Sequence, residues 1–188
     1  MTFFPISDTL QGDIAGFIPT NLISMTDGQI YLSSTLFGEG FKPAVDLGLS
    51  VSRVGNKVQS KVMRELVGDL ELKYIQYRRL LKATKLRAGI SDELINRLRH
   101  GEKIERIFIQ EKNHPSPIAE QLILFYALRE GILDVLSDEK CDGFKRNILS
   151  FAQKNFPGMV KKLEEEKEST ALDRKQLNEC IVGFFKES

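Results

Sequence analysis

The sequence predicts a mainly α-helical protein, with a helical bundle in residues 59–188 and a short segment of strands and turns in residues 1–58. Two observations lead to this fold class. Gly and Pro recur through the first 58 residues, where they divide the chain into short pieces. After Gln59, apolar residues recur at helical spacing instead. We therefore expect two domains, with their boundary between residues 58 and 59.

Strand signals in the first domain lie at residues 2–6, 29–33 and 45–52. The last is the clearest, because apolar residues alternate there with small or polar ones. Asp27-Gly28 is a strong turn dipeptide, since Gly accepts positive φ. Taken alone, it predicts a hairpin between the sequences LISM and IYLS that flank it.

The second domain is expected to contain five or six helices. Their expected positions are residues 58–75, 91–110, 118–135, a helix that includes 144–152, and a last helix that includes 172–184. Ser91 should cap the second helix, and Pro115 and Pro117 should break the chain before the third. The charged stretch KKLEEEKE at residues 161–168 predicts a solvated helix face.

Composition excludes several classes of function. Lys plus Arg number 27 and Asp plus Glu 26, so no overall field favours nucleic acid or an anionic membrane surface. No apolar run approaches the roughly 18 residues that a membrane helix needs, so direct membrane insertion is not expected. Cys141 and Cys180 have no second Cys or His at metal-ligand spacing. We expect both to be packing residues in a reducing compartment, and no metal site.

Motifs for independent catalysis are missing from the sequence. It contains neither G-x-x-x-x-G-K-[ST] nor G-x-G-x-x-G, and His100 is expected near a helix C-terminus in an ordinary setting. Arg53 is the residue most closely tied to chemistry. It continues the apolar alternation of residues 45–52, where a guanidinium cannot be buried unpaired, so the strand should end at Ser52 with Arg53 at its carboxyl edge. From the residues alone, Arg53 is either an ordinary surface or ion-paired arginine or a ligand-binding one.

Two longer segments carry a family resemblance. GFIPTNLISMTDGQIYL at residues 16–32 and KPAVDLGLSVSRVG at residues 42–55 resemble the alpha subunit of F-type ATP synthases, and the similarity extends over nearly the whole chain. The resemblance implies that residues 1–58 are the C-terminal fragment of a RecA-like (P-loop ATPase) nucleotide-binding domain that lacks the P-loop. It implies that residues 59–188 are the helical C-terminal domain. It also suggests that the chain after Pro19 forms a helical turn.

The family implies a role in a rotary ATP synthase. Alpha subunits alternate with beta subunits in a hexameric ring around a gamma-subunit stalk, and the complex couples ATP synthesis or hydrolysis to proton or sodium transport. Arg53 matches the arginine finger that alpha extends into the catalytic site of a neighbouring beta subunit. The expected location is peripheral, on the inner face of a bacterial plasma membrane and within that complex.

The resemblance also implies further nucleotide-binding or interface residues. Ser24, Asp27 and Gly28 match an element close to the same catalytic interface, and Ser52 adjoins the arginine. From the residues alone, Asp27-Gly28 needs no ligand to be explained.

A second, non-catalytic nucleotide of the family is lined by residues that match Phe37 and Gln110. Lys42 and Lys112 stand where the family has Arg and Gln. ATP or ADP with Mg would be held by sequence absent here or by the neighbouring subunit.

Two other interpretations stay open. The chain could be a stand-alone helical interaction module or the product of a truncated, non-functional gene. Within the family, it could be a relative of secretion or flagellar ATPases. In each case we expect residues 59–188 to fold by themselves and residues 1–58 to be labile.

Overall fold

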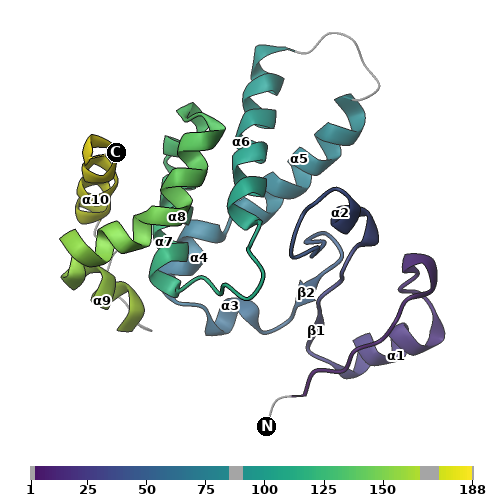
Figure 1. The fold of residues 1–188 in the computed structure, drawn as a ribbon. Helices are drawn as coiled ribbons and strands as arrows, with labels where there is room; N and C mark the ends of the chain where they lie inside the picture. The colour runs from purple at the N-terminus through teal and green to yellow at the C-terminus, as the bar shows by residue number, and fades with distance from the viewer. Residues whose placement is uncertain (1–2, 85–90, 166–173, 188) are drawn as a thin grey trace. The chain divides into compact units, whose positions relative to one another are not determined.

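The computed structural model describes residues 3–84, 91–165 and 174–187 (Figure 1). The chain is mainly helical and divides into two compact units, Met1–Val58 and Gln59–Ser188. We call them the N-terminal and C-terminal units.

The N-terminal unit combines short helices with a two-stranded sheet (Figure 1). Its elements are η1 (Leu10–Gly12), α1 (Phe17–Met25), β1 (Gly28–Gln29), α2 (Ser34–Gly38), β2 (Val51–Ser52) and α3 (Gly55–Val58). The strands are antiparallel, with Gly28 opposite Ser52 and Gln29 opposite Val51. An isolated bridge joins Leu32 to Val45.

The predicted strands are largely wrong, although the strand end at Ser52 is correct. Residues 47–49 form a turn within the predicted strand, because Asp46 Oδ1 accepts hydrogen bonds from the backbone N–H of Gly48 at 2.9 Å and of Leu49 at 3.2 Å. The strand expected at residues 29–33 stops at Gln29, after which Tyr31 N–H donates to the Ser50 hydroxyl instead of to a strand. Residues 3–6, the described part of the first predicted strand, are irregular.

The hairpin that the turn dipeptide predicted is also wrong. LISM lies in α1, which begins two residues before Pro19. Pro is tolerated in the first turn of a helix, because the N–H groups there have no partner within the helix. The helical turn suggested by the family resemblance is therefore confirmed.

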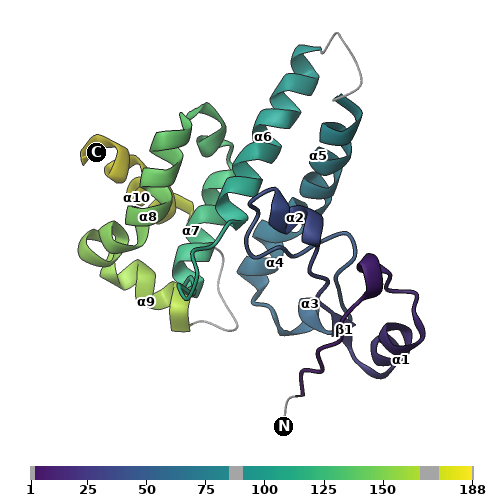
Figure 2. The same ribbon diagram turned by 45° about the vertical axis from the view of Figure 1, so that its right-hand side comes forward.

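The C-terminal unit is entirely helical in the residues that the structure describes. Its elements are α4 (Lys61–Val67), α5 (Leu70–Thr84), α6 (Asp92–Phe108), α7 (Ile118–Arg129), η2 (Ile132–Val135), α8 (Asp138–Asn155), α9 (Pro157–Glu165) and α10 (Arg174–Glu187). In both ribbon views α5 and α6 lie side by side as a helical pair (Figures 1 and 2).

Some helix boundaries differ from the predicted ones. The long first helix is divided into α3, α4 and α5, because Ser60 caps a new helix by accepting from Met63 N–H and α4 ends at Gly68. The helix predicted to reach residue 135 ends at Arg129, since Gly131 adopts φ 70° and leads into a 3₁₀ turn.

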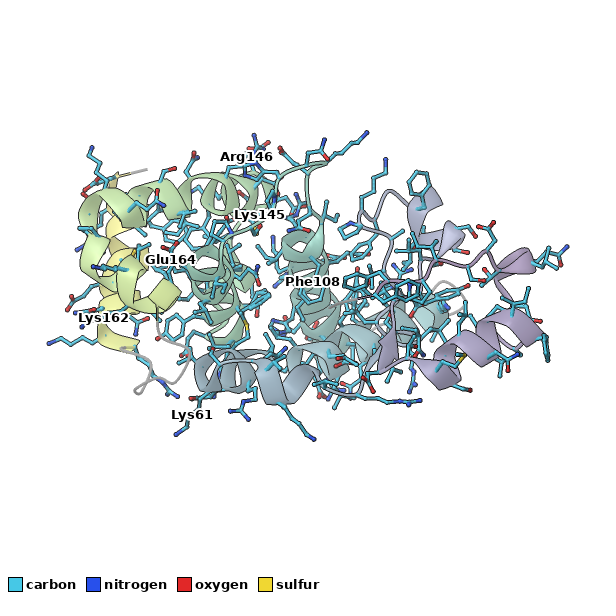
Figure 3. All side chains as sticks on the ribbon, turned by 90° about the horizontal axis from the view of Figure 1, so that it is seen from below. Lys61, Phe108, Lys145, Arg146, Lys162 and Glu164 are labelled. Carbon is cyan, nitrogen blue, oxygen red and sulfur yellow. The ribbon has the colours of Figure 1, made fainter. Side chains whose placement is uncertain are left out.

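Other predictions for this unit are confirmed. Ser91 caps α6, its hydroxyl accepting from Leu94 N–H at 3.4 Å, and the helix ends at Phe108. Lys161, Lys162 and Glu164 are exposed on α9, as the solvated face required, and Figure 3 shows Lys162 at the outer side of that helix. The predicted residues 166–168 and 172 lie outside the described ranges.

The core of the C-terminal unit is built around α7. Eight of its twelve residues are buried, and it packs against α4, α6, α8, α9 and α10. Aromatic side chains extend the core between α8 and α10, where the rings of Phe144 and Phe184 meet edge to face at 5.3 Å. Each large apolar side chain buried in this core contributes roughly 1.5–3 kcal/mol to the stability of the unit.

Candidate functional site

The backbone around Arg53 is held by the two-stranded sheet. One residue beyond the paired strands, Arg53 N–H donates to the carbonyl oxygen of Asp27 at 2.9 Å. This bond sets Arg53 beside the Asp27-Gly28 turn, although the two segments are distant in sequence. The structure therefore brings together four of the predicted site residues, namely Asp27, Gly28, Ser52 and Arg53.

The side chain of Arg53 is exposed. Within the part of the chain that the structure describes, its guanidinium has no ion-pair or hydrogen-bond partner. Its position is fixed from both sides, since Ser52 Oγ accepts from Gly55 N–H at 2.9 Å and so links the end of β2 to the start of α3. An exposed guanidinium on a fixed backbone can offer its charge to a ligand from outside the chain.

Gly28 is required by the close approach of the two strands. A Cβ atom there would lie 2.3 Å from the carbonyl oxygen of Val51, and φ is 156°. Any other residue would push β2, and with it Arg53, away from β1. The turn chemistry of Asp27-Gly28 thus has a structural role that needs no ligand.

Ser24 is turned away from this group. Its hydroxyl donates to the Thr20 carbonyl oxygen within α1 at 2.8 Å, as serine often does inside a helix. Thr26, which the sequence analysis did not single out, joins α1 to the strand, because its hydroxyl lies 2.9 Å from Leu22 O and 3.0 Å from Gly28 O. The position of a hydroxyl residue directly after a helix could have predicted this role of Thr26.

Two of the residues matched to an adenine site lie together in the N-terminal unit. Lys42 Nζ lies 4.9 Å from the centre of the Phe37 ring, whose side chain is exposed. An exposed ring beside an ammonium group can stack on a base and attract a phosphate, so this pair fits a nucleotide. Gln110 is exposed just after α6, in the C-terminal unit.

The part of the chain that the structure describes offers no cluster of three or more His, Cys, Asp or Glu side chains that could hold a metal ion.

A row of basic residues on α6 was not foreseen from the sequence. His100, Lys103 and Arg106 face acidic residues of η2 and α8. His100 Nδ1 lies 2.8 Å from Asp134 Oδ2, so this histidine is inside α6 and not at a helix C-terminus as expected. The i, i+3 spacing of the three basic residues could have predicted that they share one face of the helix.

The other two ion pairs of this row shift the pKa values of Asp138 and Arg106. Lys103 Nζ lies 2.7 Å from Asp138 Oδ1, and this hydrogen bond holds the pKa of Asp138 below its usual value. Arg106 Nη1 lies 2.7 Å from Asp142 Oδ2, and this bond raises the pKa of the guanidinium. Each of the three basic side chains has at least one acidic partner, so the row holds α6 against η2 and α8, whereas the buried Nε2 of His100 has no hydrogen-bond partner among the described residues.

Lys145 closes the end of α6. Its Nζ donates to the carbonyl oxygens of Arg106, at 2.9 Å, and of Ile109. Burial lowers its pKa. Figure 3 shows Lys145 on the inner side of α8 and Arg146 at its outer side. A lysine at this point satisfies carbonyls that the helix end leaves free.

Comparison with protein families matches both units. The model described as "ATP synthase alpha/beta chain, C terminal domain" matches residues 59–184. The model described as "ATP synthase alpha/beta family, nucleotide-binding domain" matches residues 1–52.

Individual relatives bear the same name. ATP synthase subunit alpha of Petrotoga mobilis is 39% identical over 185 residues, which cover 98% of this chain and 37% of the relative. The subunit alpha of Aquifex aeolicus is 34% identical over 184 residues, which cover 98% of this chain and 37% of that relative. The sodium ion specific subunit alpha of Acetobacterium woodii is 36% identical over 186 residues, covering 99% and 37%.

The chain therefore spans little more than a third of the length of these relatives. Both of its units match the same family, one of them over the greater part of the chain. The relatives with which it aligns almost from end to end are alpha subunits. The chain belongs to the ATP synthase alpha/beta family and corresponds to the C-terminal portion of subunit alpha.

Proposed function

We propose that this chain acts within the catalytic ring of an F-type ATP synthase, where Arg53 reaches the nucleotide site of a neighbouring beta subunit. The observation that carries the proposal is the exposed guanidinium of Arg53, which has no partner among the described residues and sits on a backbone held by Asp27 and Ser52.

The chemistry of phosphoryl transfer explains what such an arginine contributes. Negative charge spreads over the γ-phosphate oxygens in the transition state, and a guanidinium placed there in advance stabilises it. An arginine supplied across an interface accelerates the reaction by about 10³ to 10⁵, equivalent to roughly 4–7 kcal/mol of barrier. Lysine replaces it poorly, since a point charge lacks the planar fork of five donors.

The remaining parts of the proposal concern the assembly. ATP or ADP and its Mg are held in the catalytic site by the beta subunit, and Phe37 and Lys42 contribute to a second, non-catalytic nucleotide site. The C-terminal unit faces the gamma-subunit stalk. The complete complex would couple ATP turnover to proton or sodium transport and lie peripherally on the inner face of a bacterial plasma membrane.

Among the described residues, no helix has both the length and the apolar character needed to cross a bilayer.

A chimeric subunit tests the role of Arg53. The matched portion of Petrotoga mobilis subunit alpha is replaced with this chain, and the chimera is assembled with the beta and gamma subunits of that organism. ATP hydrolysis should fall by about 10³ or more in Arg53→Ala and be only partly retained in Arg53→Lys.

Arg146→Ala is the matched control, because Arg146 is an exposed arginine on the outer side of α8 (Figure 3). It should leave hydrolysis unchanged. If Arg53→Ala hydrolyses ATP as fast as this control, the assignment of Arg53 is wrong, and a role as a helical interaction module becomes the better account of the chain.

A further inference from the structure

A cavity lies between α5 and α6, the helical pair of the C-terminal unit (Figures 1 and 2). Its volume is about 370 Å³, which falls within the range of roughly 300–1,000 Å³ that small-molecule sites occupy. The lining side chains recur at i, i+3, i+4 and i+7 along each helix, so one stripe of α5 faces one stripe of α6. The two helices therefore enclose a space large enough for a small ligand.

The deeper part of this cavity is apolar. Tyr77 is buried and Leu80 is half-buried, and both line the space from α5. The Tyr77 hydroxyl donates to Glu105 Oε2 at 2.8 Å, so the polar end of this side chain is already engaged. The ring remains as a surface on which an aromatic or other apolar group can rest.

Two cations lie at the exposed edge of the cavity. The Lys73 ammonium has no hydrogen-bond or ion-pair partner within residues 3–84, 91–165 and 174–187. Arg97 Nη2 lies 2.8 Å from Glu93 Oε1, but these side chains are 64% and 78% exposed. An ion pair with that exposure contributes little to stability, so a carboxylate from outside the chain can replace Glu93 at small cost.

His100 supplies an independent sign that something occupies this cavity. Its Nδ1 lies 2.8 Å from Asp134 Oδ2, whereas its Nε2 is buried and has no hydrogen-bond partner in the described part of the chain. Folded proteins rarely leave a buried polar atom unsatisfied. Because His100 also lines the cavity, a carboxyl or hydroxyl group bound there can supply the missing partner.

We propose that the cavity between α5 and α6 binds a small aromatic carboxylate. Lys73 and Arg97 attract its negative charge, and the exposed amides of Gln76 and Asn96 offer further donors beside them. Its apolar body rests on the ring of Tyr77. A ligand that contacts both helices stabilises the α5–α6 pair, since it binds only when the two helices are packed together.

The site is separate from the proposed role of the chain in a catalytic ring. All of its residues belong to the C-terminal unit, whereas Arg53 belongs to the N-terminal unit. A failure of either proposal therefore leaves the other standing.

Nuclear magnetic resonance of the isotopically labelled full chain tests the inference, with naphthoate as the probe. Naphthoate should shift the amide signals of α5 and α6 around Tyr77 and His100 in a saturable way. Naphthamide has the same ring without the charge and serves as the neutral comparison. It should bind about tenfold more weakly, because it cannot pair with the two cations.

Charge variants locate the carboxylate. Lys73→Gln/Arg97→Gln should weaken naphthoate binding about tenfold, because each exposed cation contributes several-fold to the affinity. Arg79→Gln/Lys82→Gln is the matched control. It removes the same charge from exposed positions of α5 that do not line the cavity, so it should bind naphthoate like the unmodified chain. All four replaced side chains are exposed, so neither variant disturbs the core.

Several results would overturn the inference. The absence of saturable shifts in α5 and α6 would show that the cavity does not bind this class of ligand. Equal affinities of the two double variants, or of naphthoate and naphthamide, would show that Lys73 and Arg97 do not recognise a carboxylate. Shifts confined to residues 3–58, where many apolar side chains are exposed, would place the probe on the N-terminal unit instead.

Discussion

Two helical glycines of the C-terminal unit show how sharply the cost of a single methyl group depends on its surroundings. A Cβ on Gly101 would lie 2.1 Å from the ring of Tyr77, whereas nothing lies within 4 Å of one on Gly143. We expect Gly101→Ala to lower the free energy of unfolding by about 1–3 kcal/mol through overpacking. Gly143→Ala should raise it by about 0.5–1 kcal/mol through helix propensity. Urea unfolding measures both, and equal stabilities would contradict the close packing of α5 on α6.

The burial of the two cysteines predicts that their thiols react slowly. Both are buried, and burial raises the pKa of the Cys180 thiol to about 11 and that of Cys141 above its usual value. Since only the thiolate reacts, both should be inert to a disulfide reagent at pH 8 in the folded protein and react rapidly in urea. Stoichiometric reaction of the native chain within seconds would show that the core between α8 and α10 is open.

The position of Arg53 was predictable from the sequence only in part. Its place at a strand end followed from the alternation of residues 45–52, even though only Val51 and Ser52 of that segment form a strand. The family resemblance put Asp27 near the same interface, but local patterns alone could not predict its bond to Arg53, because that bond depends on long-range pairing of two-residue strands. Local patterns do not encode such pairing, and Asp46 redirected the chain by a side-chain bond that competes with it.

At the scale of elements, the ion pairs between α6 and α8 make the free energy of unfolding depend on pH. The hydrogen bond from Lys103 lowers the pKa of Asp138 in the folded protein. The stability that this bond adds is therefore fully present above the usual pKa of 3.8 and is lost as the pH falls through the lower pKa of the folded state. Asp138 is 64% exposed, so Asp138→Asn should cost at most about 0.5–1 kcal/mol at pH 7. This difference should shrink below pH 3.8.

Glu139→Gln provides the control for Asp138→Asn. It removes a charge from the same first turn of α8, so it reports the helix-dipole effect alone. Chemical unfolding from pH 2 to 7 compares the two variants. A cost for Asp138→Asn that equals that of Glu139→Gln at every pH would show that Lys103 does not stabilise the helix contact.

Helices were more predictable than strands for a physical reason. Helical periodicity and caps are local, so the limits of α6 followed from Ser91 and the apolar spacing. The breaks at Gly68 and Gly131 were missed, because a glycine within a periodic apolar pattern does not by itself show whether a helix continues. The row on α6 was missed because its acidic partners lie on other elements.

At the scale of the whole molecule, the two units should differ in stability. The C-terminal unit has an extensive core, whereas the N-terminal unit buries three apolar residues in its described part. Hydrogen exchange of the full chain should show strong protection in α7 and α8 and weak protection in residues 3–58. Equal and strong protection in both units would contradict this, and would mean that the N-terminal unit is stable without a covering partner.

The central claim is that Arg53 serves a nucleotide held by another subunit. The most direct measurement is a structure of the chimeric alpha subunit assembled with beta subunits and a bound ATP analogue. The account predicts the Arg53 guanidinium at hydrogen-bonding distance, about 3 Å, from a phosphate oxygen in the neighbouring beta subunit. A guanidinium that instead points into its own subunit, with no phosphate in reach at any catalytic site, would contradict it.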